Sequence, residues 1–223
     1  MENGFPYFDE SVFFEFPPLE TSGEDGLLAV GGNLSPGMLI SAYKQGIFPW
    51  YSDGYPIMWW SPDPRYVLFP EKLHVPGSLE KYLKKNLFNV FFNTRFNEII
   101  EECSIMKRPG QQGTWITEEI KKAYIKLFEL GYISCAAVTE PGSDKLAGGV
   151  YGVKIGKCFY GESMFAKVDN ASKYGFVKLV DRLRQDGVVI IDCQMETVHL
   201  KRFGAEMIPR KEFIDIIKRQ QLF

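Results

Sequence analysis

The hydrophobic and polar positions follow different patterns in the first part of the chain and in the rest. In the first part, one segment has the signature of a helix, SPGMLISAYKQG (35–46), in which Ser35 can cap the start, Pro36 suits the first turn and Gly46 can end it. Residues 47–70 hold too many prolines for regular structure and too many aromatic residues for a flexible linker. We therefore expect an ordered, packed loop segment there.

Beyond residue 70 the pattern becomes regular. Apolar residues at helical spacing predict helices near 77–86, 94–105 and 117–130. The last of these has Thr117 as a candidate N-cap, acidic residues in its first turn and Gly131 as its stop. Three apolar runs follow, separated by the short turn signals PGSD and IGK, which favour an antiparallel meander of strands at 132–140, 145–156 and 157–165.

The last part of the chain alternates helices and strands. A helix opens at Asn170 or Ser172, carries one apolar stripe and closes at Gly187. The run VVIIDCQ (188–194) predicts a buried strand, and a helix and a short strand follow at 196–203 and 206–208. Three antiparallel strands, helix, strand, helix, strand is the order of a GNAT-like acyltransferase core.

The expected fold class is therefore α+β, with two domains. A small N-terminal domain, rich in Pro, Gly and aromatic residues, covers 1–68. A GNAT-like catalytic domain covers 69–223, with a mixed, mainly antiparallel sheet flanked by helices.

Composition and charge restrict the classes of function. The hydrophobic fraction of 45% and the charged fraction of 24% are ordinary for a globular protein, and the net charge of −2 does not indicate a nucleic-acid binder. Basic residues do cluster locally, each time as expected of a solvated helix face or loop, at Lys81, Lys84 and Lys85, then at Lys107 and Arg108, then at Lys121 and Lys122.

Cysteine and histidine usage predicts neither a disulfide framework nor a metal site, because the four cysteines are far apart in sequence and there are two histidines. The N-terminus lacks the basic region and apolar core of a secretory signal, and no apolar run approaches the roughly 20 residues of a membrane span. We therefore expect a cytoplasmic protein without membrane contact, metal or cofactor.

Three polar residues end the run VVIIDCQ and are the first candidates for chemistry. Because side chains alternate along a strand, Asp192 and Gln194 should share one face while Cys193 takes the other. Taken alone, such a motif is more often a structural turn cap than a catalytic pair. A nucleophilic pair of Cys193 with His199 is the alternative, but a cysteine that points into packed core is usually inert, so we expect no covalent intermediate.

The donor of the acyl group is not expected to be coenzyme A. Acyl-CoA-dependent enzymes of this fold hold the pyrophosphate on backbone amides at a helix start. The best match to their motif, RQDGVV (184–189), departs at its last position and lies at a helix end. Another carrier must therefore deliver the acyl group.

The chain resembles the leucyl/phenylalanyl-tRNA protein transferase family over nearly its whole length. The resemblance rests on eight blocks in order, GLLAVGGNLSP, AYKQGIFPWYS, PIMWWSPDPRYVLFP, GTWIT, YGVKIGKCFYGESMF, NASK, IDCQ and GAEMIPR. It implies an enzyme without cofactor that moves Leu or Phe, with Met left open, from Leu-tRNA or Phe-tRNA to proteins that begin with Arg or Lys. The product then enters bacterial N-degron (N-end rule) degradation.

The resemblance also implies roles for the strand-end residues. The family's catalytic positions match Asp192 and Gln194. Asp192 would hold the incoming amine and help it lose its proton, which needs little assistance because an α-amino group has a pKa of about 7.7–8.0. Gln194 would orient the amine or the ester carbonyl and stabilise the developing oxyanion.

The aminoacyl group requires a carboxylate beside an apolar pocket. Glu162 matches the family position that accepts hydrogen bonds from the aminoacyl ammonium. The residues expected to wall the pocket, which can equally be ordinary core, are Phe159, Met164, Phe176, Ile191 and Val150, the last at a position where relatives carry a larger residue.

The tRNA itself requires stacking and phosphate contacts. Trp50 and Trp115 match the family positions that stack on the terminal adenosine, whereas Trp59 and Trp60 are expected to pack the two regions together. The candidates for contacts to phosphates of the tRNA body are Lys81, Lys84 and Lys85.

Selection of a basic acceptor residue requires carboxylates near the amine site. Asp192 is one candidate, and Glu196 is a weaker one that we expect to face solvent. Three other classes stay open: an acyl-CoA-dependent acetyltransferase, a tRNA-dependent transferase that acts on cell-wall precursors, and an inactive RNA-binding module. We expect a monomer.

Overall fold

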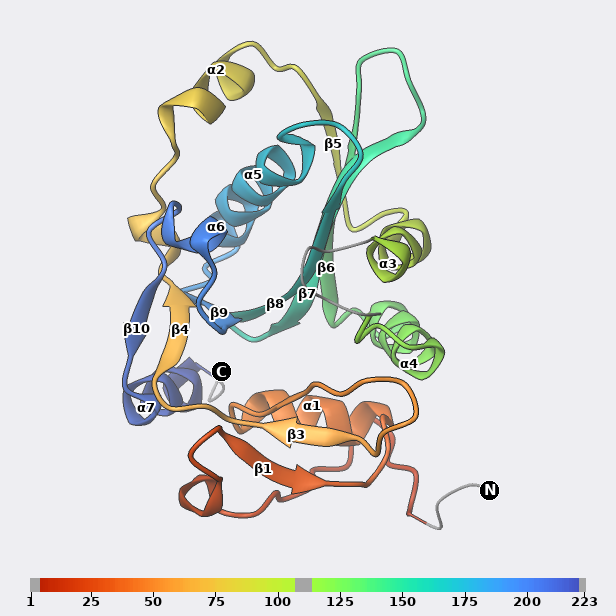
Figure 1. The fold of residues 1–223 in the computed structure, drawn as a ribbon, viewed down its shortest axis with the longest axis vertical. Coiled ribbons are helices and arrows are strands. Elements are labelled where there is room, and N and C mark those ends of the chain that lie inside the picture. Colours follow the sequence, from red (N-terminus) through yellow and green to blue (C-terminus); the bar gives the residue numbers. More distant parts are fainter. Residues whose placement is uncertain (1–4, 107–113, 221–223) are drawn as a thin grey trace.

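The computed structural model describes residues 5–106 and 114–220, and these form two sheets with helices around them (Figure 1). The smaller sheet has the strand order β1-β3-β2, and the larger has seven strands in the order β10-β4-β9-β8-β7-β6-β5. In the larger sheet only β8 and β9 pair in parallel among the described residues, so the sheet is mixed and mainly antiparallel. The predicted fold class is confirmed.

The elements have the following bounds. The strands are β1 Leu27–Val30, β2 Phe48–Pro49, β3 Met58–Trp60, β4 Arg65–Leu68, β5 Asn89–Phe92, β6 Ile133–Thr139, β7 Leu146–Ile155, β8 Cys158–Ala166, β9 Ile190–Gln194 and β10 Glu206–Ile208. The helices are α1 Pro36–Lys44, α2 Gly77–Lys84, α3 Phe96–Ile105, α4 Glu118–Glu129, α5 Ala171–Gln185, α6 Val198–Lys201 and α7 Arg210–Gln220.

Helices cover both faces of the large sheet. Helix α5 packs on one face against β6 and β7, while α3 packs on the other face against β7 and β8 (Figure 1). The small sheet and α1 lie at one end of the large sheet, where α1 contacts α4 and β7. The small sheet and α1, which together we call the small N-terminal unit, therefore lie against one end of the large sheet. The polar residues of β9 lie near the same end.

The helices predicted from residue 70 onward are confirmed in their order and approximate bounds. The Thr117 hydroxyl caps α4 by accepting a hydrogen bond of 3.2 Å from the backbone N–H of Ile120. Ser35 does occupy the N-cap position of α1, but the prediction of a side-chain cap was wrong, because its buried hydroxyl makes no such bond.

The expectation of a loop segment at 47–70 was also wrong, because β2, β3 and β4 lie there. The prolines fall at strand ends and between strands, where a missing N–H costs little. Strand β4 pairs between β10 and β9 in the large sheet, although it precedes the proposed domain boundary at residue 68, which stays a prediction. Strand β5 and helix α7 had not been anticipated.

A substitution of Gly152 can test how closely β7 packs against β8. A Cβ there would lie 2.1 Å from the carbonyl oxygen of Tyr160 and 2.5 Å from the ring of Phe159, and that oxygen cannot move without the sheet. We expect Gly152→Ala to lower the free energy of unfolding by about 1–3 kcal/mol in urea titrations.

The matched control is Gly77→Ala, since a Cβ at Gly77 would meet no atom within 4 Å. We expect that change to stay within about 0.5 kcal/mol of the wild type. Equal stabilities of the two variants would contradict the packing described for β7 and β8.

Candidate active site

The site lies where the parallel strands β8 and β9 separate. Their pairing runs from Cys158 opposite Ile190 to Tyr160 opposite Asp192, and then stops. Glu162 on β8 and Gln194 on β9 each lie two residues beyond the last pair. The gap that opens between the strands supplies a cleft with one polar residue on either side.

Each of these two residues is placed by an irregularity in the strand pairing. On β8, Gly161 pairs with Gly152 and Ser163 with Tyr151, so Glu162 is an extra residue. On β9, the pairing with β4 shifts in the same way between Asp192 and Gln194, and Gln194 has a φ of +57°. Bulges of this kind redirect side chains and are frequent beside active sites.

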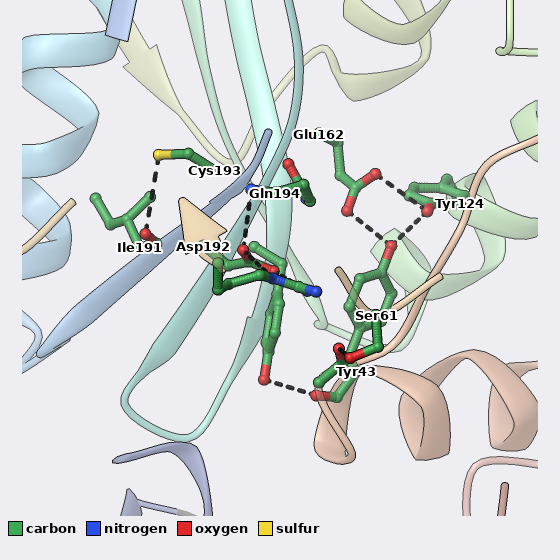
Figure 2. A network of polar contacts seen from close by, with 11 residues as sticks. Tyr43, Ser61, Tyr124, Glu162, Ile191, Asp192, Cys193 and Gln194 are labelled. Carbon is green, nitrogen blue, oxygen red and sulfur yellow. Dashed lines mark hydrogen bonds and ion pairs between the residues drawn. The ribbon is translucent and has the colours of Figure 1, made fainter. Parts of the chain in front are cut away.

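The Glu162 carboxylate is held by two tyrosines from different helices (Figure 2). The hydroxyl of Tyr43 on α1 donates to Oε1 at 2.7 Å, and that of Tyr124 on α4 donates to Oε2 at 3.2 Å. The two hydroxyls also lie in hydrogen-bond contact with each other. Glu162 is thus oriented jointly by α1, which contacts the small sheet, and by α4, which contacts the large sheet.

The protonation of Glu162 is unusual for a carboxyl group. Burial raises its pKa to about 8, aided by the charge of Asp192 and opposed by the two tyrosine hydrogen bonds and by the Arg65 charge. The raised pKa favours the protonated form of Glu162 at neutral pH.

Asp192 is enclosed by the protein. Both of its carboxylate oxygens accept from Arg65, at 2.8 Å from Nε and 2.6 Å from Nη2, and Oδ1 also accepts from the backbone N–H of Gln194 at 3.0 Å. The exposed fractions are 0% for Arg65 and 1% for Asp192. The Arg65 guanidinium lies between the rings of Phe48 and Phe213, each 4.8 Å away.

Asp192 and Gln194 differ in their access to the cleft. The sequence predicted that their side chains share one face. In the structure two cavities open at the site, and Gln194 lines both of them while Asp192 lines neither. The bulge at this point of β9 explains the difference. Cys193 turns away from Glu162 and toward the carbonyl of Ile191 (Figure 2), and burial raises the pKa of its thiol. The residue nevertheless lines both cavities beside Gln194, so the expected separation of Cys193 from the cleft was wrong.

An apolar cavity of about 300 Å³ opens on one side of Glu162 and Gln194. The structure brings together around it all the residues that the sequence proposed for the pocket, namely Val150, Phe159, Met164, Phe176 and Ile191. Leu200 and Thr197 complete the part nearest α6. The cavity can take a large apolar side chain while Glu162 lies at its polar edge.

A second cavity of about 220 Å³ shares Glu162 and Gln194 with the first. Trp50, which follows β2, and Trp115, which precedes α4, both line it although they lie far apart in the sequence. Trp60 donates from Nε1 to the backbone carbonyl of Trp50 at 2.7 Å, and Trp59 is buried. Two partly exposed indoles beside a carboxyl group are suited to a flat, stacking ligand.

The remaining sequence candidates lie away from these cavities. Glu196 is exposed and forms an ion pair with Lys201, as expected of a solvent-facing residue. Lys107 and Arg108 lie outside the described residues.

The three candidates for contact with tRNA phosphates, Lys81, Lys84 and Lys85, are all exposed. Lys84 forms an ion pair with Glu80, whereas Lys81 and Lys85 form no ion pair within the described ranges.

Sequence reasoning missed three residues that position the site, Arg65, Tyr43 and Tyr124. Arg65 follows a proline-rich segment without periodicity, and the two tyrosines lie within predicted helices, where no local signal distinguishes a tyrosine that positions a carboxyl group from one that packs in the core. Among the described residues no group of His, Cys, Asp and Glu could hold a metal ion. No helix in the described ranges is long and apolar enough to span a membrane.

Comparisons with known proteins agree on one family. Residues 67–218 match the family model for leucyl/phenylalanyl-tRNA protein transferase, and residues 32–63 match the model for its N-terminal domain. Among solved structures, L-PGS from Bacillus licheniformis has a TM-score of 0.41 and 7% identity, over 62% of this chain and 49% of that one, which supports no inference.

Curated relatives with the name leucyl/phenylalanyl-tRNA–protein transferase match nearly the whole chain. The protein from Christiangramia forsetii is 51% identical over 91% of this chain and 96% of its own. Those from Myxococcus xanthus and Pseudomonas entomophila are each 50% identical, over 92% of this chain and 86% and 90% of theirs. The chain therefore belongs to the leucyl/phenylalanyl-tRNA protein transferase family and is an aminoacyltransferase that moves Leu or Phe from aminoacyl-tRNA to protein N-termini.

Proposed function

We propose that this transferase draws on Leu-tRNA and Phe-tRNA and joins the amino acid to proteins that begin with Arg or Lys. The observation that carries the donor part of the proposal is the position of Glu162, at the junction between an apolar cavity and a tryptophan-lined cavity. An aminoacyl-adenosine has a matching arrangement of parts, with an ammonium between an apolar side chain and a flat base. A donor of this kind is made in the cytoplasm, where we place the enzyme, acting as a monomer.

The donor fits the site in one orientation. The Leu or Phe side chain enters the cavity walled by Phe159, Met164 and Phe176, while the adenine stacks beside Trp50 and Trp115. The α-ammonium then meets the Glu162 carboxylate, which Tyr43 and Tyr124 hold in place. The ester carbonyl comes to lie near Gln194, which lines both cavities.

The reaction is aminolysis of an ester. The neutral α-amine of the acceptor attacks the ester carbonyl, the new C–N bond forms, the C–O bond to the ribose breaks, and the proton of the amine ends on the departing ribose oxygen. The Gln194 side-chain amide donates to the developing oxyanion. Little assistance with deprotonation is needed, because an α-amino group has a pKa of about 7.7–8.0.

Asp192 contributes to this chemistry by position. Its side chain is 1% exposed and lines neither cavity, so a direct contact with the acceptor amine would require the end of β9 to rearrange. Instead, Asp192 fixes the bulge from which the Gln194 side chain extends into the cleft. We assign catalysis to Gln194 and the support of its geometry to Asp192 and Arg65.

A transfer assay tests the function. We expect radiolabelled Phe from Phe-tRNA to appear on a peptide that begins with Arg, and not on the same peptide acetylated at its N-terminus. Gln194→Ala should lower kcat by about a hundredfold to a thousandfold, the usual effect of losing one oxyanion donor. Thermal unfolding should show little change, because Gln194 is partly exposed.

Asp192→Asn and Asp192→Ala complete that experiment. Removing one partner of a buried ion pair costs about 3–5 kcal/mol of stability, so both variants need an unfolding curve beside the activity. Full activity of a folded Asp192→Asn variant would contradict the positioning role. No label on any basic N-terminus with the wild type would refute the proposed function.

The raised pKa of Glu162 predicts that donor binding releases a proton. At about pH 7 both Glu162 and the donor ammonium are protonated when free, since their pKa values are about 8 and about 7.7–8.0, but the bound pair shares one proton. The affinity should therefore rise about tenfold per pH unit up to about pH 7.7 and fall above about pH 8. Calorimetry with a stable amide analogue of aminoacyl-adenosine, in buffers of different ionisation enthalpy, measures the released proton.

Glu162→Gln is the matched variant for this measurement. It keeps the shape and the tyrosine contacts but cannot ionise, so we expect no proton release and no rise in affinity below about pH 7.7. We expect the affinity itself to fall by about tenfold or more, because a charge-assisted hydrogen bond is removed. Proton release that persists in the variant would assign the ionisation to another group.

Val150 sets the depth of the apolar cavity. Its side chain is 3% exposed and forms part of the cavity wall. We expect Val150→Ile to lower kcat/KM for Phe-tRNA at least about tenfold more than for Leu-tRNA, because one methylene in a closed pocket is worth about 1–3 kcal/mol. The control is Val153→Ile, which adds the same group to the core outside the cavity and should leave the ratio of the two donors unchanged.

A further inference from the structure

A third cavity, of about 300 Å³, adjoins the apolar cavity but has a different lining. His199 lines both, so the two cavities lie on either side of one side chain. The lining of the third cavity includes Lys173 and Arg202 and no acidic residue. The roles described above leave this cavity unused.

Within the part of the chain that the structure describes, neither cation of this cavity forms an ion pair. Arg202 is exposed and forms no ion pair within the described residues, and the hydrogen bond of Lys173 goes to the neutral side chain of Asn170 at 3.2 Å. Many Lys and Arg residues elsewhere on this protein pair with a carboxylate, as Lys72, Lys167 and Lys201 do. A cavity with unpaired cations in a protein of net charge −2 favours an anionic ligand.

His199 points to the same kind of ligand. Its Nε2 atom is buried without a hydrogen-bond partner among the described residues, although its ring packs edge-on against Phe203. Burial lowers the pKa of His199, and the charges of Lys173 and Arg202 lower it further, which favours the neutral ring. An anion near Lys173 and Arg202 would offset the effect of their charges on the imidazole.

The backbone adds a further contribution at the same place. Asn170 and Lys173 belong to the start of α5, a helix of 15 residues whose first turn contains no acidic residue. The unpaired N–H groups of such a turn carry partial positive charge and favour anions. The two cations, the imidazole ring and the start of α5 are therefore gathered around one cavity.

The position of this cavity identifies the source of the anion. On one side it meets the aminoacyl cavity through His199, and on the other it is lined by Ser78 and Leu79 of α2. Helix α2 ends with the exposed residues Lys81, Lys84 and Lys85. The cavity therefore lies between the aminoacyl cavity and the helix that carries the other candidates for tRNA phosphate contacts.

We propose that the cavity between α2, α5 and α6, lined by Lys173, His199 and Arg202, binds a backbone phosphodiester of the donor tRNA near its aminoacylated end. The inference rests on the use of charged tRNA as the donor. The site anchors the strand beside the reaction centre, so it contributes to the affinity for tRNA and not to recognition of the amino acid or the adenine.

Charge-removing variants with two donors test the proposal. For Lys173→Gln and Arg202→Gln we expect the KM for charged tRNA to rise about five- to tenfold, and the slope of log affinity against log salt to become shallower by about 0.7 for each phosphate that is no longer bound. Binding of the aminoacyl-adenosine analogue, which carries no phosphate, should stay within about twofold of the wild type. The controls are Arg184→Gln on α5 and Lys201→Gln on α6, which remove charges that do not line the cavity.

Three outcomes would overturn the proposal. An unchanged KM and salt slope for tRNA would show that no phosphate of the donor lies there, even if inorganic phosphate binds the wild type and not the variants. An equal loss for the adenosine analogue would show that the residues act through the aminoacyl cavity. An equal rise in KM for charged tRNA in the two control variants would show that the effect comes from the overall charge of the protein and not from this cavity. A wild type that does not use charged tRNA would refute the proposed function itself.

Discussion

Arg65 and Asp192 lie fully buried against each other, and the geometry of the site depends on this ion pair. A buried pair adds little net stability, since desolvation offsets most of the attraction, but losing one partner costs about 3–5 kcal/mol. The pair joins β4 to β9 at the point where β9 leaves its neighbour β8. The ion pair thereby holds the bulged end of β9 in place, where the pairing with β4 shifts in register. The Gln194 side chain projects from this bulge into the cleft.

The site as a whole is built from interruptions in a regular sheet. The end of the β8–β9 pairing creates the space, and the bulges at Glu162 and at the end of β9 turn one polar residue into it from each side. The walls come from ordinary alternation on β7, β8 and β9, which supplies a large apolar surface without special residues. One sheet therefore provides both the rigid frame and the exceptions that make a binding cleft.

The sequence predicted most of the catalytic domain because each signal was local. The cap at Thr117, the stop at Gly131 and the apolar stripe of α5 depend on residues a few positions apart. The short strands β2, β3 and β4 could not be predicted, because they are stabilised by partners far away in the sequence. The pocket residues were identified through resemblance, whereas the Arg65–Asp192 contact spans 127 positions and left no local pattern.

Tyr43 shows what the joint construction of the site means for the whole molecule. Its phenol holds Glu162, while its backbone carbonyl accepts a hydrogen bond of 2.7 Å from Tyr160 on β8. Helix α1 thus helps to position the carboxyl group that we propose binds the donor ammonium, and it cannot be exchanged as an independent module. A redesign of the donor preference would therefore have to consider the residues that wall the cavity and the packing of α1 together.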